Sequence, residues 1–157
     1  MEEVKYLTFY VGNEVLALDL LHIKEIIPYE DITEIPLMQE CILGVINLRG
    51  HIVPVVDINK RLELNVNMEF YKHRSIVIVS IVEDEKEIDI GIVVNVVSEV
   101  FSYVLDDLES SPLFGTKIKK RFVKQEAKIG TVFIPILDIE NVLNVEELSV
   151  TNQDGIQ

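Results

Sequence analysis

Hydrophobic residues along this chain occur in short runs, rich in valine and isoleucine, that are separated by polar or glycine-containing turns. Because β-branched side chains pack well on a pleated sheet and lose rotamer freedom in a helix, these runs predict strands. A turn of only a few residues between two runs predicts an antiparallel hairpin. Four hairpins are expected in this way, from residues 6–11 with 15–20, 42–48 with 51–56, 75–82 with 87–94, and 127–129 with 131–137.

Only two segments have a helical pattern, residues 58–64 and 139–148. Each begins directly after an aspartate, Asp57 or Asp138, whose carboxylate is well placed to accept hydrogen bonds from the first backbone N–H groups of the helix. We therefore interpret both aspartates as N-caps rather than as an acid–base pair. The least regular region is 105–124, where we expect a long loop.

The motif around these aspartates occurs twice. Residues 54–58 (Pro-Val-Val-Asp-Ile) match residues 135–139 (Pro-Ile-Leu-Asp-Ile) at an offset of 81, and a leucine follows five residues after each aspartate, at Leu62 and Leu143. A second match at an offset of 74 lies upstream, between residues 17–19 and 91–93 and between 23–26 and 97–100. The sequence therefore predicts duplication of a small β unit, and a twofold repeat does not suit a solenoid or a propeller.

Two packed five-stranded antiparallel β-barrels with short helices would use this number of strands and leave few open edges. The polar segment 65–73 is the natural boundary between the two copies. We expect one domain over residues 1–157, with residues 1–66 as the first barrel and 67–157 as the second. The C-terminal helix is expected to pack back on the first barrel.

Composition supports a β-rich, globular chain. Hydrophobic residues make up 48% of it, and it has 22 Val and 21 Ile but only two Ala, which argues against disorder and against a helical bundle. The net charge of −13 argues against nucleic-acid binding and against docking on anionic lipid. The acidic N-terminus does not resemble a secretory signal, and the apolar stretches are too short to span a bilayer. The single cysteine, Cys41, cannot form an internal disulfide and is expected to be buried, which fits the cytoplasmic location that we expect.

The common catalytic patterns are missing from this sequence. It has no glycine-rich phosphate loop and no glycine-flanked nucleophilic serine. The histidines at 22, 51 and 73 lack metal-ligand spacing, and the acidic turn 83–87 lacks the alternating ligands of a calcium loop. We therefore predict no catalytic residue, no metal and no cofactor, and we do not expect an enzyme.

Two basic features remain. The cluster Lys117, Lys119, Lys120 and Arg121 fits either a solvated loop or electrostatic steering toward an acidic partner. Arg49 lies between two apolar strands, next to a glycine that readily adopts the positive φ of a tight turn. An arginine at a rigid hairpin tip could bind the carboxylate or carbonyl groups of a partner, or could be an ordinary solvated turn residue.

Residues 44–57 (Gly-Val-Ile-Asn-Leu-Arg-Gly-His-Ile-Val-Pro-Val-Val-Asp) closely resemble the signature of CheW-like domains, which occur in bacterial chemotaxis coupling proteins. The resemblance extends through residues 16–19, 23–26, 91–94 and 135–139, so it covers nearly the entire chain. The fold it implies is a pair of SH3-like β-barrels, which agrees with the duplication.

The resemblance implies a non-catalytic adaptor in the cytoplasm, recruited to membrane receptor arrays. Its implied partners are the regulatory domain of the histidine kinase CheA, which shares the double-barrel fold, and the cytoplasmic tips of methyl-accepting chemoreceptors. It implies no nucleic acid and no direct membrane insertion. The partner-binding residues carried over from the family are Ile23, Glu25, Gly44, Asn47, Arg49 and Val100.

Within this set, Arg49 is the arginine associated with receptor coupling. Ile23 and Val100 could line an apolar groove between the barrels that receives the hydrophobic face of a receptor helix. One departure from the family pattern is Asn95, which stands where many members have aspartate. The change puts any salt bridge there in doubt, although an amide can still cap or stabilise a turn.

Two alternatives stay open at this point. The chain could serve an array for pilus motility or another chemosensory pathway instead of flagellar chemotaxis. It could also be a regulatory domain that binds a small metabolite between its two halves, although no glycine loop or polar cluster in the sequence supports that function.

Overall fold

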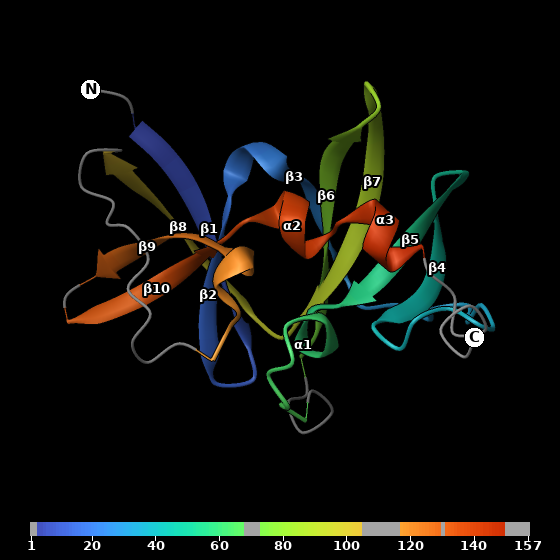
Figure 1. The fold of residues 1–157 in the computed structure, drawn as a ribbon, viewed down its shortest axis with the longest axis horizontal. Helices are drawn as coiled ribbons and strands as arrows, with labels where there is room; N and C mark the ends of the chain where they lie inside the picture. Colours follow the sequence, from blue (N-terminus) through green and yellow to red (C-terminus); the bar gives the residue numbers. More distant parts are fainter. Residues whose placement is uncertain (1–2, 68–72, 105–116, 130, 150–157) are drawn as a thin grey trace.

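The computed structural model describes residues 3–67, 73–104, 117–129 and 131–149. These residues form two five-stranded sheets that lie side by side (Figure 1). The first sheet has the order β8-β1-β2-β10-β9. Its strands are β1 (Glu3–Val11), β2 (Glu14–Asp19), β8 (Val97–Val104), β9 (Val123–Ile129) and β10 (Val132–Leu137).

The second sheet has the order β3-β6-β7-β5-β4. Its strands are β3 (Ile23–Pro28), β4 (Ile42–Leu48), β5 (His51–Asp57), β6 (Ser75–Glu83) and β7 (Lys86–Val94). All four predicted hairpins are present, as β1–β2, β4–β5, β6–β7 and β9–β10. The mainly β fold with two five-stranded units is therefore confirmed.

The two sheets have equivalent topologies. Strands β1 to β5 correspond in order to β6 to β10, and each sheet combines one early hairpin with the three later strands of the other copy. The predicted duplication is thereby confirmed. The expectation of purely antiparallel barrels is wrong, because β2 pairs with β10 and β5 pairs with β7 in parallel. In each case two hairpins from different copies meet along strands that run in the same direction.

The two copies exchange their first hairpins. After β2 the chain passes through the short 3-10 helix η1 (Leu20–His22) and enters the other sheet, and after β7 it crosses back at Asn95. Each sheet therefore draws strands from both 1–66 and 67–157, so the division between sheets does not follow the expected boundary. The exchange makes each copy depend on the other for its sheet.

The short helices carry the predicted caps but differ in length from the predictions. The Asp57 carboxylate accepts from the N–H groups of Asn59 and Lys60 at 3.0 and 3.4 Å, and Asp138 accepts from Asn141 at 3.3 Å. The single helix expected over 139–148 is wrong, because the Asn144 side chain starts a new helix. The helices are α1 (Ile58–Arg61), α2 (Ile139–Val142) and α3 (Val145–Leu148), with a further 3-10 helix η4 (Lys120–Phe122).

One large apolar core spans both sheets. Phe9 and Leu18 of the first sheet belong to the same buried cluster as Val55 and Ile78 of the second. The two repeated leucines, Leu62 and Leu143, are in it as well, and Cys41 is buried as predicted. The first sheet also has a smaller buried cluster of its own, formed by Tyr6, Ala17, Ala127, Ile134 and Ile136. Most of the loop expected over 105–124 lies outside the described residues, and its last part forms η4 and the start of β9.

Candidate partner-binding site

The β4–β5 hairpin ends in a tight turn at Arg49 and Gly50. Both residues have positive φ values, 51° and 86°, which is the pattern of a type I′ turn. Leu48 and His51 form the last strand pair, and the Asn47 side-chain oxygen accepts a hydrogen bond from the Gly50 N–H at 2.9 Å. The Arg49 side chain is 70% exposed on this fixed turn. The hairpin therefore presents a guanidinium group from a well-defined backbone.

The Arg49 guanidinium donates a hydrogen bond to the carboxylate of Glu25 and forms an ion pair with it. Glu25 lies in β3, and β3 and β4 are the opposite edges of the second sheet. The contact between them means that the sheet curls so that its two edges approach each other, as in a barrel. The carboxylate raises the pKa of Arg49. The other carboxylate oxygen of Glu25, Oε1, is buried without a hydrogen-bond partner among the described residues.

Gly44 shapes this edge of the sheet from within. Its φ is 146°, and a Cβ atom added there would lie 2.1 Å from the carbonyl oxygen of Thr33. Thr33 and Val45 exchange two backbone hydrogen bonds of 2.9 Å each. Only glycine lets the backbone of Thr33 approach β4 so closely. Gly44 therefore acts on the site by positioning backbone, and its own atoms are buried.

The two apolar candidates lie in different sheets. Ile23 begins β3, pairs with Val79, and packs half-buried against the shared core. Val100 lies in β8, pairs with Leu7, and is 50% exposed. A shallow depression of about 590 Å³ beside the Arg49 hairpin is lined by Lys24 and by residues of β4, β5 and β7. A groove lined by both Ile23 and Val100 stays a prediction.

Two exposed apolar residues were missed by the sequence reasoning. Ile26 is the repeat equivalent of Val100 at the offset of 74, and it is 43% exposed on β3. Ile52 is 65% exposed beside the Arg49 turn and lines the depression there. The internal repeat could have identified Ile26. Ile52 could have been found from strand alternation, because it lies out of phase with the buried Val53 and Val55.

Asn95 stabilises the first hairpin from the link between β7 and β8. Its side-chain oxygen accepts a hydrogen bond from the Gly12 N–H at 2.5 Å, and its own N–H donates to the Tyr10 carbonyl at 2.8 Å. Asn95 is only 2% exposed. The expectation that an amide can serve as a cap here is confirmed. In this buried position a neutral amide avoids the free-energy cost of desolvation that a charged carboxylate would have.

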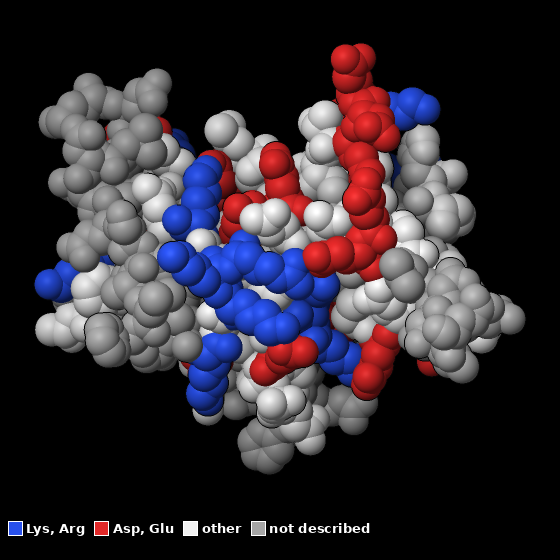
Figure 2. All heavy atoms as spheres, viewed as in Figure 1, with Lys and Arg blue, Asp and Glu red and all other residues white. Residues whose placement is uncertain are grey.

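The basic cluster at 117–121 makes ion pairs within the chain. Lys117 pairs with Glu14, Lys119 with Glu63, and Arg121 with Glu147, at 3.9, 3.3 and 2.7 Å. Figure 2 shows lysine and arginine side chains gathered over the middle of one face, with acidic side chains beside them. These three cations therefore have acidic partners within the chain. Steering toward an acidic partner stays a prediction.

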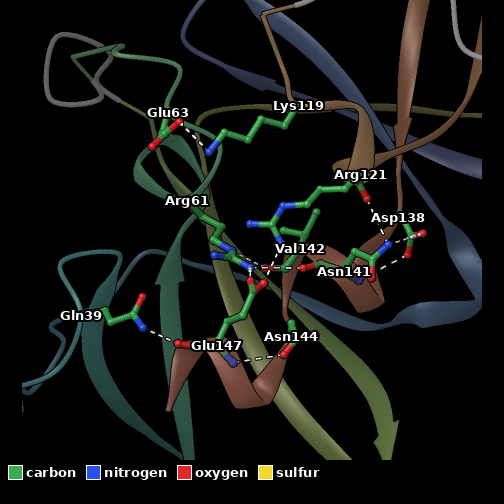
Figure 3. A network of polar contacts seen from close by, with 10 residues as sticks. All are labelled: Gln39, Arg61, Glu63, Lys119, Arg121, Asp138, Asn141, Val142, Asn144 and Glu147. Atoms are coloured by element: carbon green, nitrogen blue, oxygen red, sulfur yellow. Dashed lines mark hydrogen bonds and ion pairs between the residues drawn. The ribbon is translucent and has the colours of Figure 1, made fainter. Parts of the chain in front are cut away.

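Glu147 is the centre of the polar network in Figure 3. Its carboxylate accepts hydrogen bonds from both Arg61 and Arg121, and these two bonds hold the pKa of Glu147 below its usual value. Its backbone carbonyl accepts from the Gln39 side chain, and its N–H donates to Asn144 at 3.1 Å. The network joins α3 to α1, to η4 and to the segment before β4.

The described residues contain no group of three or more His, Cys, Asp or Glu arranged to hold a metal ion. In that same part of the chain, no helix has the length and apolarity to cross a membrane. Burial raises the pKa of Asp57, and its hydrogen bonds to Asn59 and Lys60 act in the opposite direction. Both bonds belong to the helix cap, so the interpretation of this aspartate as a cap is confirmed.

Comparison with known proteins identifies the family. A CheW-like domain matches residues 5–147. The chain is 33% identical to the chemotaxis protein CheW of Thermotoga maritima over 96% of this chain and 93% of that protein. It is 30% identical to that of Klebsiella aerogenes over 94% and 86%. The scaffolding protein TtCheW from Thermoanaerobacter tengcongensis is similar in structure, with a TM-score of 0.77 and 30% identity over 92% of this chain and 94% of that one. The chain therefore belongs to the CheW-like family of chemotaxis proteins, a family of scaffolds rather than enzymes.

Proposed function

We propose that this chain is an adaptor that couples chemoreceptors to the histidine kinase CheA in a membrane-associated signalling array. The observation that carries the proposal is the rigid hairpin that presents Arg49 beside Glu25, in a chain that matches the CheW-like family over residues 5–147. The family places the chain in chemotaxis, and the hairpin supplies a chemically specific surface for a partner.

The Arg49–Glu25 pair presents an exposed hydrogen-bond donor group held in place by a carboxylate. The guanidinium has donors beyond the one that bonds to Glu25, and Arg49 is largely exposed. The Glu25 Oε1 atom accepts no hydrogen bond from the described residues. Because Oε1 is buried, the group open to a partner is the guanidinium of Arg49, which could donate hydrogen bonds to a carboxylate or carbonyl group of the partner. Asn47 and Gly44 act in this proposal as positioning residues, because they fix the turn and the adjacent strand.

The apolar part of the proposed site includes Ile23 and Val100. Ile26 and Val100 are exposed at repeat-equivalent positions on the edge strands β3 and β8. An amphipathic receptor helix buries apolar residues on one face, and such residues are its natural contacts. With one contact surface on each sheet, the chain could engage two partners at once.

The shared core supports a mechanical role for the whole chain. Side chains of both sheets pack in one cluster, so a partner bound to one sheet acts on a body that includes the other. In this mechanism the adaptor performs no chemistry. It binds receptor and kinase together, so that the conformational equilibrium of the receptor biases the activity of the kinase.

The test is a reconstitution with receptor-bearing membranes, CheA and this chain. We expect the chain to increase both the retention of CheA on the membranes and the response of kinase activity to receptor ligand. Arg49→Glu should reduce both effects, whereas the matched control Lys86→Glu, at the tip of the β6–β7 hairpin, should leave them intact. If the unmodified chain neither retains CheA nor changes its response, the adaptor proposal is wrong.

A further inference from the structure

Strand β3 has a bulge directly beside Glu25. Its pairs with β6 run from Ile23–Val79 to Glu25–Ile78, so β3 advances by two residues where β6 advances by one. Lys24 is the extra residue. A bulge bends its strand and changes the direction of the neighbouring side chains, and bulges recur next to functional sites. The position of the Glu25 carboxylate therefore depends on how this bulge is held.

The internal repeat contains the same bulge in the other sheet. The register between β8 and β1 shifts between Leu7 and Phe9, and β8 has one residue more than β1 across the shift. The Thr8 hydroxyl donates a hydrogen bond to the Glu99 carbonyl at 3.0 Å and accepts one from the Glu99 N–H at 3.2 Å. Glu99 corresponds to Glu25 at the offset of 74. In this copy one hydroxyl thus holds both backbone groups of the equivalent glutamate.

The bulge in β3 is held in another way. Opposite Glu25 lies Ile78, whose side chain has no hydroxyl to replace that of Thr8. Instead the Nζ of Lys24 donates hydrogen bonds to both carboxylate oxygens of Asp89, at 3.0 and 3.2 Å. Asp89 lies in β7, which is separated from β3 by β6, so the side chain of the bulge residue crosses one strand to reach it. This ion pair fixes the bulge from outside the β3–β6 ladder.

Lys24 and Glu25 are consecutive residues, so a constraint on one acts on the other through the backbone. One carboxylate oxygen of Glu25 accepts a hydrogen bond from Arg49, and the other accepts none from the described residues. In that part of the chain no further side-chain hydrogen bond orients this carboxylate, and its direction is set by the backbone of the bulge. Lys24, Asp89 and Arg49 line the same depression of about 590 Å³.

We propose that Asp89 is a positioning residue for the partner-binding site. Through Lys24 it fixes the bulge in β3, and the bulge holds the Glu25 carboxylate where it orders the Arg49 guanidinium. The inference rests on the proposed adaptor function, in which Arg49 binds the partner. The side chains of Lys24 and Asp89 are 48% and 31% exposed, so the pair contributes little to overall stability and its loss leaves the core intact.

NMR of the full chain without a partner tests this coupling. The guanidinium signals of Arg49, assigned by their loss in Arg49→Lys, report its bond to Glu25. Glu25→Gln should move them toward the position of a solvated arginine, and Asp89→Asn should move them in the same direction. Glu87→Gln is the matched control and should leave them in place, because Glu87 carries the same charge on the same face of β7 but bonds to Ser80. Unchanged signals in Asp89→Asn, or an equal change in the control, would overturn the proposal.

Affinity for receptor-bearing membranes and CheA supplies the second test. Asp89→Asn should weaken binding about two- to fivefold, the size of effect expected from an exposed ion pair. Asp89→Glu keeps a carboxylate for Lys24 and should bind as the wild type does. In an Arg49→Ala background, Asp89→Asn should cause no further loss, because the group that it positions is gone.

An equal loss in both backgrounds would mean that Asp89 contacts the partner itself, and it would contradict the positioning role. If the unmodified chain binds neither partner, the adaptor proposal is the one that fails. The NMR comparison contains no receptor or kinase, so it still decides whether Asp89 orders Arg49.

Discussion

Arg61 at the end of α1 donates a hydrogen bond from its Nε–H to the carbonyl oxygen of Val142 at the end of α2, at 2.6 Å. The two residues are equivalent in the internal repeat, at the offset of 81. The two copies thus meet where their short helices end, and an arginine in one copy caps the helix of the other. The terminal carbonyls of a helix lack partners within it, so this bond satisfies an acceptor that α2 cannot satisfy itself.

Replacing Arg61 should therefore destabilise the whole fold. Its side chain is only 10% exposed and also bonds to Glu147. In Arg61→Met the carbonyl of Val142 and the carboxylate of Glu147 lose a charged donor, which costs about 2–3 kcal/mol of unfolding free energy. Urea unfolding followed by circular dichroism measures it. Lys60→Met, which removes the exposed neighbouring cation, is the control and should change the stability by less than about 1 kcal/mol.

Stability should also depend on pH through Glu147. Arg61 and Arg121 lower the pKa of this carboxyl in the folded chain, so the folded state favours its charged form. The stabilisation is fully present above the unfolded pKa of about 4.3, and it is lost as the pH falls through the lower folded value.

Urea unfolding of the wild type and Glu147→Gln at several pH values tests this dependence. The wild type should be the more stable near neutral pH, and the difference should shrink as the solution becomes more acidic. Glu146→Gln is the neighbouring control and should show a smaller pH-dependent difference. A difference between wild type and Glu147→Gln that stays constant with pH would show that the carboxylate charge is not what stabilises α3.

Local features of the fold were predictable from the sequence. The hairpins follow from short-range alternation and turn residues, and the caps at Asp57 and Asp138 follow from a side chain acting within a few residues. The duplication could be recognised because both copies keep the same residues at these local positions. For the same reason, the tight turn at Arg49 could be placed before the structure was known.

Long-range features were not predictable in the same way. The exchange of hairpins between the copies depends on which sheet the chain enters after β2 and β7, and no local pattern specifies that choice. Glu25 and Arg49 lie at opposite edges of the second sheet, so their contact depends on how far that sheet curls. The break after α2 was missed because the Asn144 cap competes with an otherwise continuous helical pattern.

Two glycines of the hairpin should respond differently to alanine. At Gly44 the added Cβ meets the backbone of Thr33 and the φ of 146° is unfavourable, so Gly44→Ala should cost more than about 2 kcal/mol. At Gly50 the φ is also positive, but no atom lies within 4 Å of the added Cβ, so Gly50→Ala should cost only about 1 kcal/mol. Urea unfolding of both variants gives the comparison. Equal costs would mean that backbone strain, and not the approach of Thr33, makes Gly44 necessary.

Arg49 holds the edges of the second sheet together through Glu25, and it is also proposed to bind a partner. Exchanging the charges of Arg49 and Glu25 distinguishes these two roles. Arg49→Glu places two carboxylates together at the edge of the sheet, and it should weaken receptor or CheA binding roughly ten- to hundredfold while the fold is retained.

The double variant Arg49→Glu with Glu25→Arg restores an ion pair between the same strands. If the site serves only to close the sheet, the double variant should bind as well as the wild type. We expect it to regain the stability but not the affinity, because a partner that recognises the guanidinium at the hairpin tip meets a carboxylate there. Affinities from titration calorimetry, beside urea unfolding of the same three proteins, measure both effects. Full recovery of binding in the double variant would show that Arg49 acts only through Glu25.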